Sequence, residues 1–498
     1  MSSLLLCLLS AILLILSFPC FNLWILAWFA LVPLFFAIQG KSKAKAFLLS
    51  YITGIIFWLG TIYWLIHVTL TGMIILVLYL ALYFALFGLI ISTMNYELST
   101  LDLLFIPSVW VILEFIRSHL FTGFPWALLG YSQYLNLLFI QIADITGAWG
   151  VSFLVAWVNI SVYSVIRQPS SLIRKKYKYV FPLACIIFTS IYGYHKLNLP
   201  TTRSLLPARL KISVIQPNIS QELKWNESLR DFIMEGYFSL SKQALKDKPD
   251  LTIWPEAALP VVLEEESPYY KRVKDFVKEA KTPLLFGAVS LRDNIYYNSA
   301  LLISKEGWLL GKYDKLHLVP FGEYIPLRKI LGFLETLVPI GDFTPGRDYT
   351  VFSLPTTHYP LPTKFSVLIC FEDLFPEISR KFTKRGADFL VNITNDAWFK
   401  RTSSPYQHLL SSVFRAVENR VFLVRAANTG VSGFIAPTGK IISLVNNKFG
   451  NNIFVSGYES QEISLSKQGQ SFYTRYGDVF IVICILFVLS SIIIFKKP

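Results

Sequence analysis

Long apolar runs at both ends of the 498-residue chain constrain its fold more than any other feature. A helix that crosses the hydrocarbon core of a bilayer needs roughly 20 predominantly apolar residues. Runs of this kind fill residues 1–196 and recur in 478–498, whereas the middle of the chain has an ordinary globular composition. We therefore expect a polytopic α-helical membrane protein with three parts. These are an N-terminal transmembrane bundle over 1–196, a water-facing domain over 197–477 and a C-terminal transmembrane helix over 478–498.

The apolar runs predict about eight spanning helices. The first two are short because Pro19 and Asn22 separate them, and the fifth carries Glu114 and Arg117 near its end. Those two charges could pair within the bundle, either as a helix-end pair or in a functional role. The expected spans are residues 4–18, 22–38, 46–67, 72–94, 103–118, 147–166, 179–195 and 478–495.

The distribution of basic residues predicts the orientation in the membrane. Lysines occupy positions 41, 43 and 45 between the second and third spans, basic residues crowd 167–178, and Lys496 and Lys497 follow the last span. With eight spans, these three segments share one side, which the positive-inside rule assigns to the cytoplasm. The 197–477 domain is then on the opposite face, which in a bacterium with two membranes is the periplasmic side. The net charge of +14 forms no single basic patch, so we expect no nucleic-acid partner.

Strand-like and helix-like segments alternate through the middle domain, which predicts a layered α/β fold. The expected helices are residues 226–246, 267–281 and 404–419. The expected strands are residues 210–217, 250–255, 283–290, 298–304, 365–370, 387–393, 421–427 and 433–443.

Cys370 is the one cysteine among the five of the chain that falls in the middle domain. It directly follows the apolar run Phe365–Ile369 and precedes a segment that can turn helical. At such a junction, backbone N–H groups and the helix dipole favour a thiolate. A buried, inert cysteine is the alternative interpretation.

Two other strand ends supply the groups that a cysteine nucleophile needs. Glu256 closes the run that ends in Trp254-Pro255, and it could accept the thiol proton. A lysine of the stretch Gly311–His317, which contains Lys312 and Lys315, could stabilise both a thiolate and the oxyanion of a tetrahedral intermediate. His317 is interpreted as structural rather than as the base of a Cys-His pair. The six histidines show no i, i+4 pairing and no phosphate-binding loop is present, so we expect no metal and no cofactor.

The motifs WPE, YDK followed by HLVPFGEYIP, and ICFED resemble, in this order, the Glu-Lys-Cys triad of the nitrilase superfamily. With the surrounding helices, the chain resembles the apolipoprotein N-acyltransferase family, a membrane-embedded branch of that superfamily. The resemblance implies an αββα sandwich for the middle domain. It also implies that Glu256 is the general base, Lys315 the oxyanion stabiliser and Cys370 the nucleophile.

The same resemblance assigns supporting residues. Glu323 matches an auxiliary carboxylate near the triad lysine, and Glu372 matches the acid two positions after the nucleophile. Trp225 matches a lipid-site tryptophan, while Asn395 and Trp398 belong to an NDAWF segment that shapes the rim of the site. Two positions depart from the family pattern: Lys400 replaces a usual Gly, and Phe371 replaces a common Tyr.

The resemblance implies a two-step acyl transfer, and nothing in the sequence demands more than a monomer. The donor is a glycerophospholipid, and the acceptor is the α-amine of a diacylglyceryl-cysteine at the N-terminus of an apolipoprotein. The apolar stretch 327–343 could form a lipid-facing flap or a core helix, and Tyr296-Tyr297-Asn298 could touch substrate or simply open a strand. Two alternatives are a membrane-tethered amidase or nitrilase that uses water as acceptor, and a transporter or sensor with an inactive domain.

Overall fold

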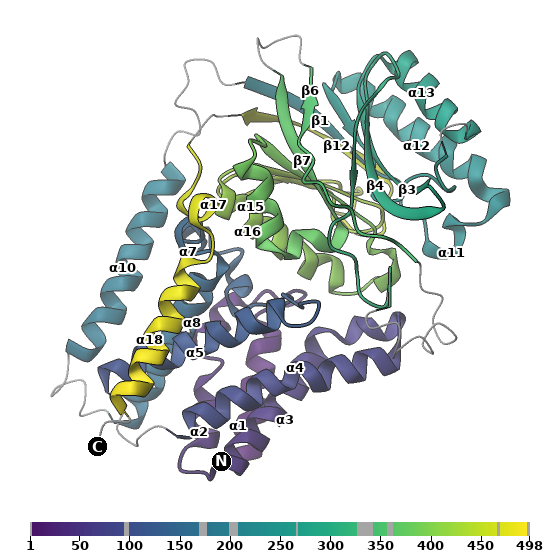
Figure 1. The fold of residues 1–498 in the computed structure, drawn as a ribbon. Helices are drawn as coiled ribbons and strands as arrows, with labels where there is room; N and C mark the ends of the chain where they lie inside the picture. The colour runs from purple at the N-terminus through teal and green to yellow at the C-terminus, as the bar shows by residue number, and fades with distance from the viewer. Residues whose placement is uncertain are drawn as a thin grey trace. The chain divides into compact units, whose positions relative to one another are not determined.

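The computed structural model describes residues 2–93, 99–168, 177–198, 208–264, 267–325, 342–355, 362–465 and 469–495 (Figure 1). The chain divides into two compact units. A helical unit comprises Met1–Leu199, Thr402–Leu410 and Ser471–Pro498, and an α/β unit comprises Pro200–Arg401 and Ser411–Gln470.

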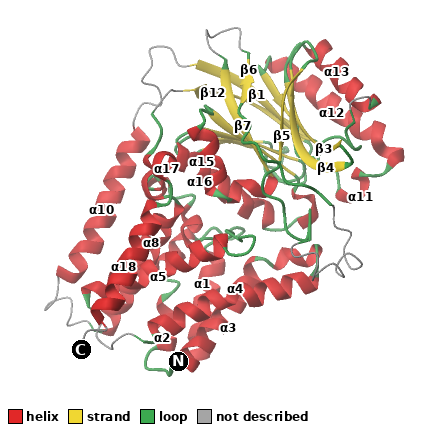
Figure 2. Cartoon of the chain, in the orientation of Figure 1, coloured by secondary structure: helices red, strands yellow, loops and turns green. Residues whose placement is uncertain are grey.

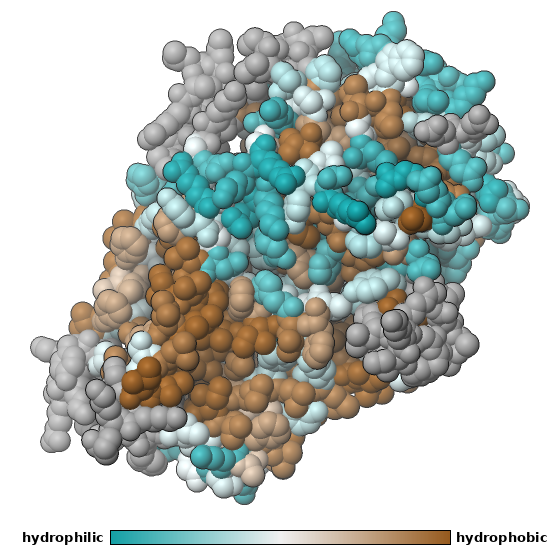
Figure 3. Space-filling model, viewed as in Figure 1, coloured by the Kyte–Doolittle hydropathy of each residue, from teal (hydrophilic) through white to brown (hydrophobic). Residues whose placement is uncertain are grey.

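Apolar helices build the helical unit, and its surface in Figure 3 is largely hydrophobic. Its described helices of four residues or more are α1 (Ser3–Leu16), η1 (Trp24–Trp28), α2 (Val32–Ile38), α3 (Lys43–Thr61), η2 (Tyr63–His67), α4 (Leu70–Ile91), α5 (Thr100–His119), η3 (Leu129–Gln133), α6 (Leu137–Ile140), α7 (Ala143–Thr146), α8 (Ala148–Arg167), α10 (Tyr177–Asn198), α17 (Phe472–Tyr476) and α18 (Val479–Phe495). Each of the eight predicted runs overlaps at least one of them.

Four described helical segments are long and apolar enough to cross a membrane: Lys43–Thr61, Leu70–Ile91, Ala148–Arg167 and Tyr179–Asn198. The first two predicted spans are shorter than expected. The 14-residue α1 represents one, and the 3-10 helix η1 followed by the 7-residue α2 represents the other. The described residues thus support a membrane part containing four helices of spanning length.

Glu114 and Arg117 of α5 both bind the backbone of the link that follows this helix. Glu114 Oε1 accepts from the Leu129 N–H at 2.7 Å, and Arg117 Nη1 donates to the carbonyls of Phe124 (2.7 Å) and Trp126 (2.8 Å). The two buried side chains therefore have a structural part at the helix end, which is one of the two interpretations that the sequence left open.

Thr402–Leu410 groups with the helical unit. Gln407 explains this grouping. Its Oε1 accepts from the indole N–H groups of Trp64 (3.1 Å) and Trp126 (2.8 Å), and its Nε2 donates to the Thr61 carbonyl (3.0 Å). A buried amide with both ends satisfied fixes the segment among these helices.

Two six-stranded sheets form the centre of the α/β unit (Figure 2). Their orders are β12-β1-β2-β3-β4-β5 and β11-β10-β9-β8-β7-β6. The first sheet contains β1 (Ala208–Gln216), β2 (Leu251–Ile253), β3 (Leu284–Arg292), β4 (Ile295–Ile303), β5 (Leu309–Asp314) and β12 (Gly457–Leu465). The second contains β6 (Phe352–Leu354), β7 (Thr363–Ile369), β8 (Phe389–Thr394), β9 (Phe422–Ala427), β10 (Gly433–Ile435) and β11 (Ile441–Leu444).

Helices cover the outer faces of these sheets. The amphipathic helices α12 (Arg230–Ala244) and α13 (Pro268–Ala280) pack apolar residues such as Tyr237 and Val273 into a core with Trp254 and Phe286. On the second sheet, α15 (Pro376–Lys384) and the later turns of α16 (Ser404–Asn419) are anchored by buried residues. The central strands β8 and β9 are buried along their whole length, as the strands of a covered parallel sheet must be. The predicted layered α/β sandwich is confirmed for this unit.

Candidate active site

The nucleophile candidate lies on a strained turn. Cys370 follows β7, opens the 3-10 helix η7 (Cys370–Leu374) and has φ of 52°. A left-handed conformation in a non-glycine residue costs of order 1–3 kcal/mol, so the surrounding structure must hold it. Asn392 of β8 does so, because its Nδ2 donates to the carbonyls of Cys370 (3.1 Å) and Leu368 (3.3 Å).

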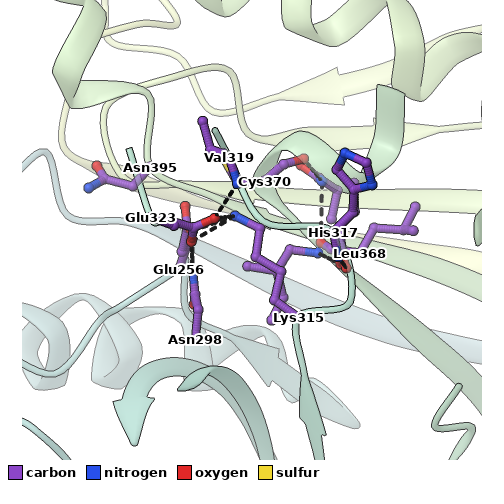
Figure 4. Close-up of polar contacts among 12 residues, drawn as sticks. Glu256, Asn298, Lys315, His317, Val319, Glu323, Leu368, Cys370 and Asn395 are labelled. Atoms are coloured by element: carbon purple, nitrogen blue, oxygen red, sulfur yellow. Dashed lines mark hydrogen bonds and ion pairs between the residues drawn. The ribbon is translucent and has the colours of Figure 1, made fainter. Parts of the chain in front are cut away.

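Lys315 is the centre of a buried charge cluster beside this turn (Figure 4). Its Nζ lies 2.9 Å from Glu323 Oε2, 3.0 Å from Glu323 Oε1 and 3.7 Å from Glu256 Oε1. Burial alone would lower the pKa of Lys315, but the carboxylates of Glu323 and Glu256 outweigh it and raise the pKa. Lys315 is therefore a permanent cation.

Asn298 joins the two carboxylates of the cluster. Its Nδ2 donates to Glu256 Oε1 and to Glu323 Oε1, both at 2.7 Å. The Val319 N–H also donates to Glu323 Oε2 at 2.7 Å, which leaves Glu323 more fully bonded than Glu256. Of the two acids, Glu256 is thus the better placed to exchange protons. Tyr296-Tyr297-Asn298, which the sequence analysis expected to touch substrate or open a strand, lies in β4, and its Asn298 contacts both carboxylates.

Both the negative and the positive side chains of this cluster shift the pKa of the Cys370 thiol. Burial raises its pKa most, Glu256 raises it further, and Lys315 acts in the opposite direction. Cys370 is consequently a thiol at rest, and its proton must leave when it attacks. Glu256 can accept the proton, because it is a carboxylate next to the Lys315 ammonium. Proton transfer to Glu256 removes the negative charge that disfavours the thiolate and leaves Lys315 to stabilise it.

Glu372 binds backbone and a tyrosine rather than the charge cluster. Its Oε1 accepts from Tyr313 Oη (2.7 Å) and from the N–H groups of Leu316 (2.7 Å) and His317 (3.1 Å), and its Oε2 accepts from Ile369 N–H (2.7 Å). Complete burial raises the pKa of Glu372 to about 7. Glu372 therefore connects the segment directly after Lys315 to the last residue of β7, which precedes Cys370.

The predicted lipid-site residue Trp225 and the predicted rim residues Asn395 and Trp398 differ in exposure. Trp225 and Trp398 are about half exposed, at 44% and 51%. Asn395 is buried: its Nδ2 donates to Gln221 Oε1 (3.0 Å), and its Oδ1 accepts from Asn428 Nδ2 (2.9 Å). The tryptophans thus offer apolar surface for a ligand, whereas Asn395 holds the segment that carries Trp225.

The two departures from the family pattern have visible local consequences. Lys400 has φ of 52° and ψ of −162°, a region that side chains rarely adopt and that explains why a Gly suits this position. Phe371 packs edge-on against Phe375, with ring centroids 5.2 Å apart, and His317 stacks on Phe375 at 3.7 Å. His317 therefore has a packing partner, in line with its structural interpretation.

Two features of the site escaped the sequence analysis. Lys224, next to Trp225, is buried and donates from Nζ to the backbone carbonyl of Glu256 at 3.3 Å. Arg425 of β9 is fully buried and donates to Asp373 (3.0 Å), Asn392 (2.8 Å) and Asp396 (3.4 Å) beneath the nucleophile turn. An arginine inside the apolar run 421–427 was the available signal for the second feature.

Of the predicted flap 327–343, residues 327–341 lie outside the described residues. Among the residues that the structure describes, no group of three or more His, Cys, Asp or Glu side chains could hold a metal ion.

Comparison with known proteins identifies the family. Residues 10–161 match the model of the apolipoprotein N-acyltransferase N-terminal domain, and residues 211–456 match that of carbon-nitrogen hydrolases. The apolipoprotein N-acyltransferase of Geobacter metallireducens is 41% identical, over 96% of this chain and 92% of that protein. The chain belongs to the apolipoprotein N-acyltransferase family. A member of this family from Rhodopseudomonas palustris is 31% identical over 89% of this chain and 83% of that protein.

Among solved structures, a mutant amidase of the nitrilase superfamily from Nesterenkonia AN1 is similar at 18% identity and a TM-score of 0.40, covering 55% of this chain and 96% of that chain. The predicted resemblance to apolipoprotein N-acyltransferases is confirmed by the relatives of nearly full length. As a member of this family the chain is an acyltransferase, and its carbon-nitrogen hydrolase match contains Glu256, Lys315 and Cys370.

Proposed function

We propose that this protein moves an acyl chain from a glycerophospholipid to Cys370 and then to the α-amine of a diacylglyceryl-cysteine at an apolipoprotein N-terminus. The observation that carries the proposal is the buried Lys315, which binds Glu323 and Glu256 and acts on the Cys370 thiol. This is the charge arrangement that acyl transfer through a thioester needs. Family membership supplies the acceptor class.

In the first half-reaction, Cys370 Sγ attacks the ester carbonyl while Glu256 takes the thiol proton. The Lys315 ammonium stabilises the oxyanion, an effect of about 3–4 kcal/mol for one such donor. Collapse of the tetrahedral intermediate breaks the ester C–O bond, Glu256 returns the proton to the leaving alkoxide, and a lysophospholipid departs. Cys370 is left as a thioester.

In the second half-reaction, the acceptor amine attacks the thioester carbonyl, and Glu256 takes the proton that the amine loses. The C–S bond breaks, the Cys370 thiolate recovers the proton, and an amide is released. Water could enter the same cycle in place of the amine, and Trp225 and Trp398 supply apolar surface that favours a lipid-bearing acceptor.

The same proposal includes the cellular setting. Eight spanning helices and an α/β unit on the non-cytoplasmic side are supported by the apolar runs and the positions of the basic residues, and family membership supports a bacterial inner membrane with a periplasmic α/β unit in a protein that acts as a monomer. The four helices of spanning length among the described residues support the membrane-embedded part.

Intact-mass analysis tests the chemistry. Purified protein incubated with phosphatidylethanolamine should gain one acyl group at Cys370, and a diacylglyceryl-cysteine peptide should remove it as an amide. Cys370→Ser should gain no hydroxylamine-sensitive adduct, whereas Cys20→Ser, which removes an exposed thiol, should behave as wild type. Discharge of the thioester by water alone would indicate a hydrolase, and a wild-type protein without adduct in detergent and in bilayers would refute the mechanism.

A further inference from the structure

Lys224 is a buried cation that the mechanism above does not use. Its side chain is only 2% exposed, on the short helix α11 (Gln221–Lys224) between β1 and α12. A buried lysine is costly unless its charge meets a partner, so its position requires a reason.

Contacts of the residues that precede Lys224 hold its segment beside the site. Gln221 accepts from Asn395 Nδ2 at 3.0 Å, while Asn428 donates to the Ile219 carbonyl at 2.7 Å and accepts from its N–H at 2.9 Å. The Lys224 Nζ then donates to the backbone carbonyl of Glu256, at 3.3 Å. The segment is therefore held by residues next to the rim, and its lysine reaches the residue that carries the base.

Among the described residues, the charges of Glu256 and of an ionised Cys370 act on Lys224. Burial lowers the pKa of Lys224 to about 8, and the negative charges of Glu256 and ionised Cys370 act against this. The interaction free energy between the two charges is shared. A thiolate at Cys370 favours the Lys224 ammonium by the same amount as the ammonium favours the thiolate.

The balance of charge around Cys370 shows why a second cation matters. Glu256 and Asp396 both disfavour the thiolate, and Lys315 is the main group that favours it. Lys315 is itself shared between two carboxylates. A further ammonium, hydrogen-bonded to the Glu256 backbone and interacting with the charge of an ionised Cys370, adds positive charge to this balance.

We propose that Lys224 is a second lysine of the acyl-transfer site, which supports the Cys370 thiolate by its charge and holds the Glu256 backbone by its hydrogen bond. It acts through these two residues, so it is a positioning residue rather than a member of the triad. The inference rests on the proposed function, in which Cys370 is the nucleophile.

The test measures the alkylation rate of Cys370 by iodoacetamide across pH 6–8, where Lys224 carries its charge, in the purified full-length protein, with the modified peptide quantified by mass. Lys224→Met removes the charge and the hydrogen bond, Lys224→Gln removes the charge but keeps an amide donor on a shorter side chain, and Lys224→Arg keeps the charge. Below pH 7 we expect the rate to fall about three- to tenfold in Lys224→Met and Lys224→Gln, as a rise of about 0.5–1 unit in the thiol pKa would cause, and to stay near wild type in Lys224→Arg. The exposed Cys20 provides an internal control whose profile should not move.

Superimposable profiles for wild type, Lys224→Met and Lys224→Gln would overturn the proposal. An equal fall in the rate in Lys224→Arg would also overturn it, because packing rather than charge would then be responsible. If Lys224→Met does not fold, Lys224→Gln decides the question. Since alkylation needs no lipid, a wild-type protein that forms no thioester but whose Lys224 variants show the lower rate would refute the proposed function, whereas a thioester without the lower rate would refute only this inference.

Discussion

At the scale of single residues, Lys315 and Lys312 form a matched pair for testing the oxyanion role. Both are on or next to β5, but Lys315 binds Glu323 and Glu256 whereas Lys312 pairs with Asp314 at 3.1 Å, away from the cluster. Lys315→Met should lower the rate of thioester formation by about 10²–10³-fold, since one oxyanion donor is lost and two carboxylates remain without their cation. Lys312→Met should stay within about threefold of wild type. Equal losses in both variants, measured by single-turnover mass analysis, would contradict the assignment.

Glu372 should make the stability of the protein depend on pH. Its pKa is about 7 in the folded protein, against an ordinary value of 4.5, so the folded state holds this proton more tightly than the unfolded state does. The resulting stabilisation is full below pH 4.5 and is lost as the pH rises through 7, and it amounts to about 3 kcal/mol for a fully buried group.

The variant Glu372→Gln should remove that dependence. It should also be less stable at pH 5, by about 1–3 kcal/mol, because an amide N–H₂ would face backbone N–H donors that the carboxyl group now accepts from. Thermal unfolding in detergent between pH 4.5 and 8 measures both effects. An unchanged slope in the variant would show that another group is responsible.

At the scale of elements, Gly287 allows the backbone segment that carries Glu256 to pack closely against β3. A Cβ on Gly287 of β3 would lie 2.7 Å from the Glu256 Cα, 2.7 Å from the Ala257 N and 2.8 Å from the Pro255 carbonyl oxygen. All three atoms belong to backbone, which cannot move aside as the end of a flexible side chain can. The close packing of β3 against the end of β2 therefore fixes where Glu256 lies.

Gly287→Ala should displace Glu256 and lower acyl transfer by at least about tenfold, with a loss of about 1–3 kcal/mol in stability. Gly236→Ala is the matched control. Gly236 lies within α12 and a Cβ there would meet nothing within 4 Å, so alanine should be neutral or stabilise by up to about 1 kcal/mol. Wild-type activity in Gly287→Ala would show that the contact does not position the base.

At the scale of the whole molecule, the proposed orientation can be checked with single cysteines in a cysteine-free background. Ser42, at the start of α3, and Lys305, in the turn between β4 and β5, are both exposed in the structure. In cells whose outer membrane alone is permeabilised, a membrane-impermeant maleimide should label Lys305→Cys at once. Ser42→Cys should react only after the inner membrane is disrupted, because the positive-inside rule places it in the cytoplasm. The reverse pattern would invert the topology.

Local signals in the sequence were enough to predict the class of the protein and the triad candidates. Apolar runs specify helices whatever their neighbours are, because burial in lipid or core needs only length and composition. Glu256 and Cys370 each follow a buried strand, which the apolar runs before them predict, but β2 and β7 belong to different sheets, so their meeting depends on how the two sheets pack. The helix at 404–419 was predicted at its observed bounds.

The remaining features depended on pairings between distant parts of the chain. The polar strand β12 pairs with β1 across about 250 residues, and its sequence alone has no strand-like apolar run. Gln407 groups with the helical unit only because Trp64 and Trp126 present their N–H groups to it. Glu372 holds the segment beyond β5, and Asn298 joins two carboxylates, through hydrogen bonds that no local pattern contains.

The sequence by itself thus determined which segments are helices in an apolar environment, that the middle of the chain is a layered α/β domain, and which residue types could perform acyl transfer. Only the tertiary structure decided which polar side chains are buried together, and so brought Lys224 to Glu256 and placed Lys315 between two carboxylates. The physical reason is that the periodicity of apolar residues along a segment reflects which of its faces contact solvent and which contact the core. The partners of a buried charge are set by sheet register and by packing between segments that are far apart in the chain.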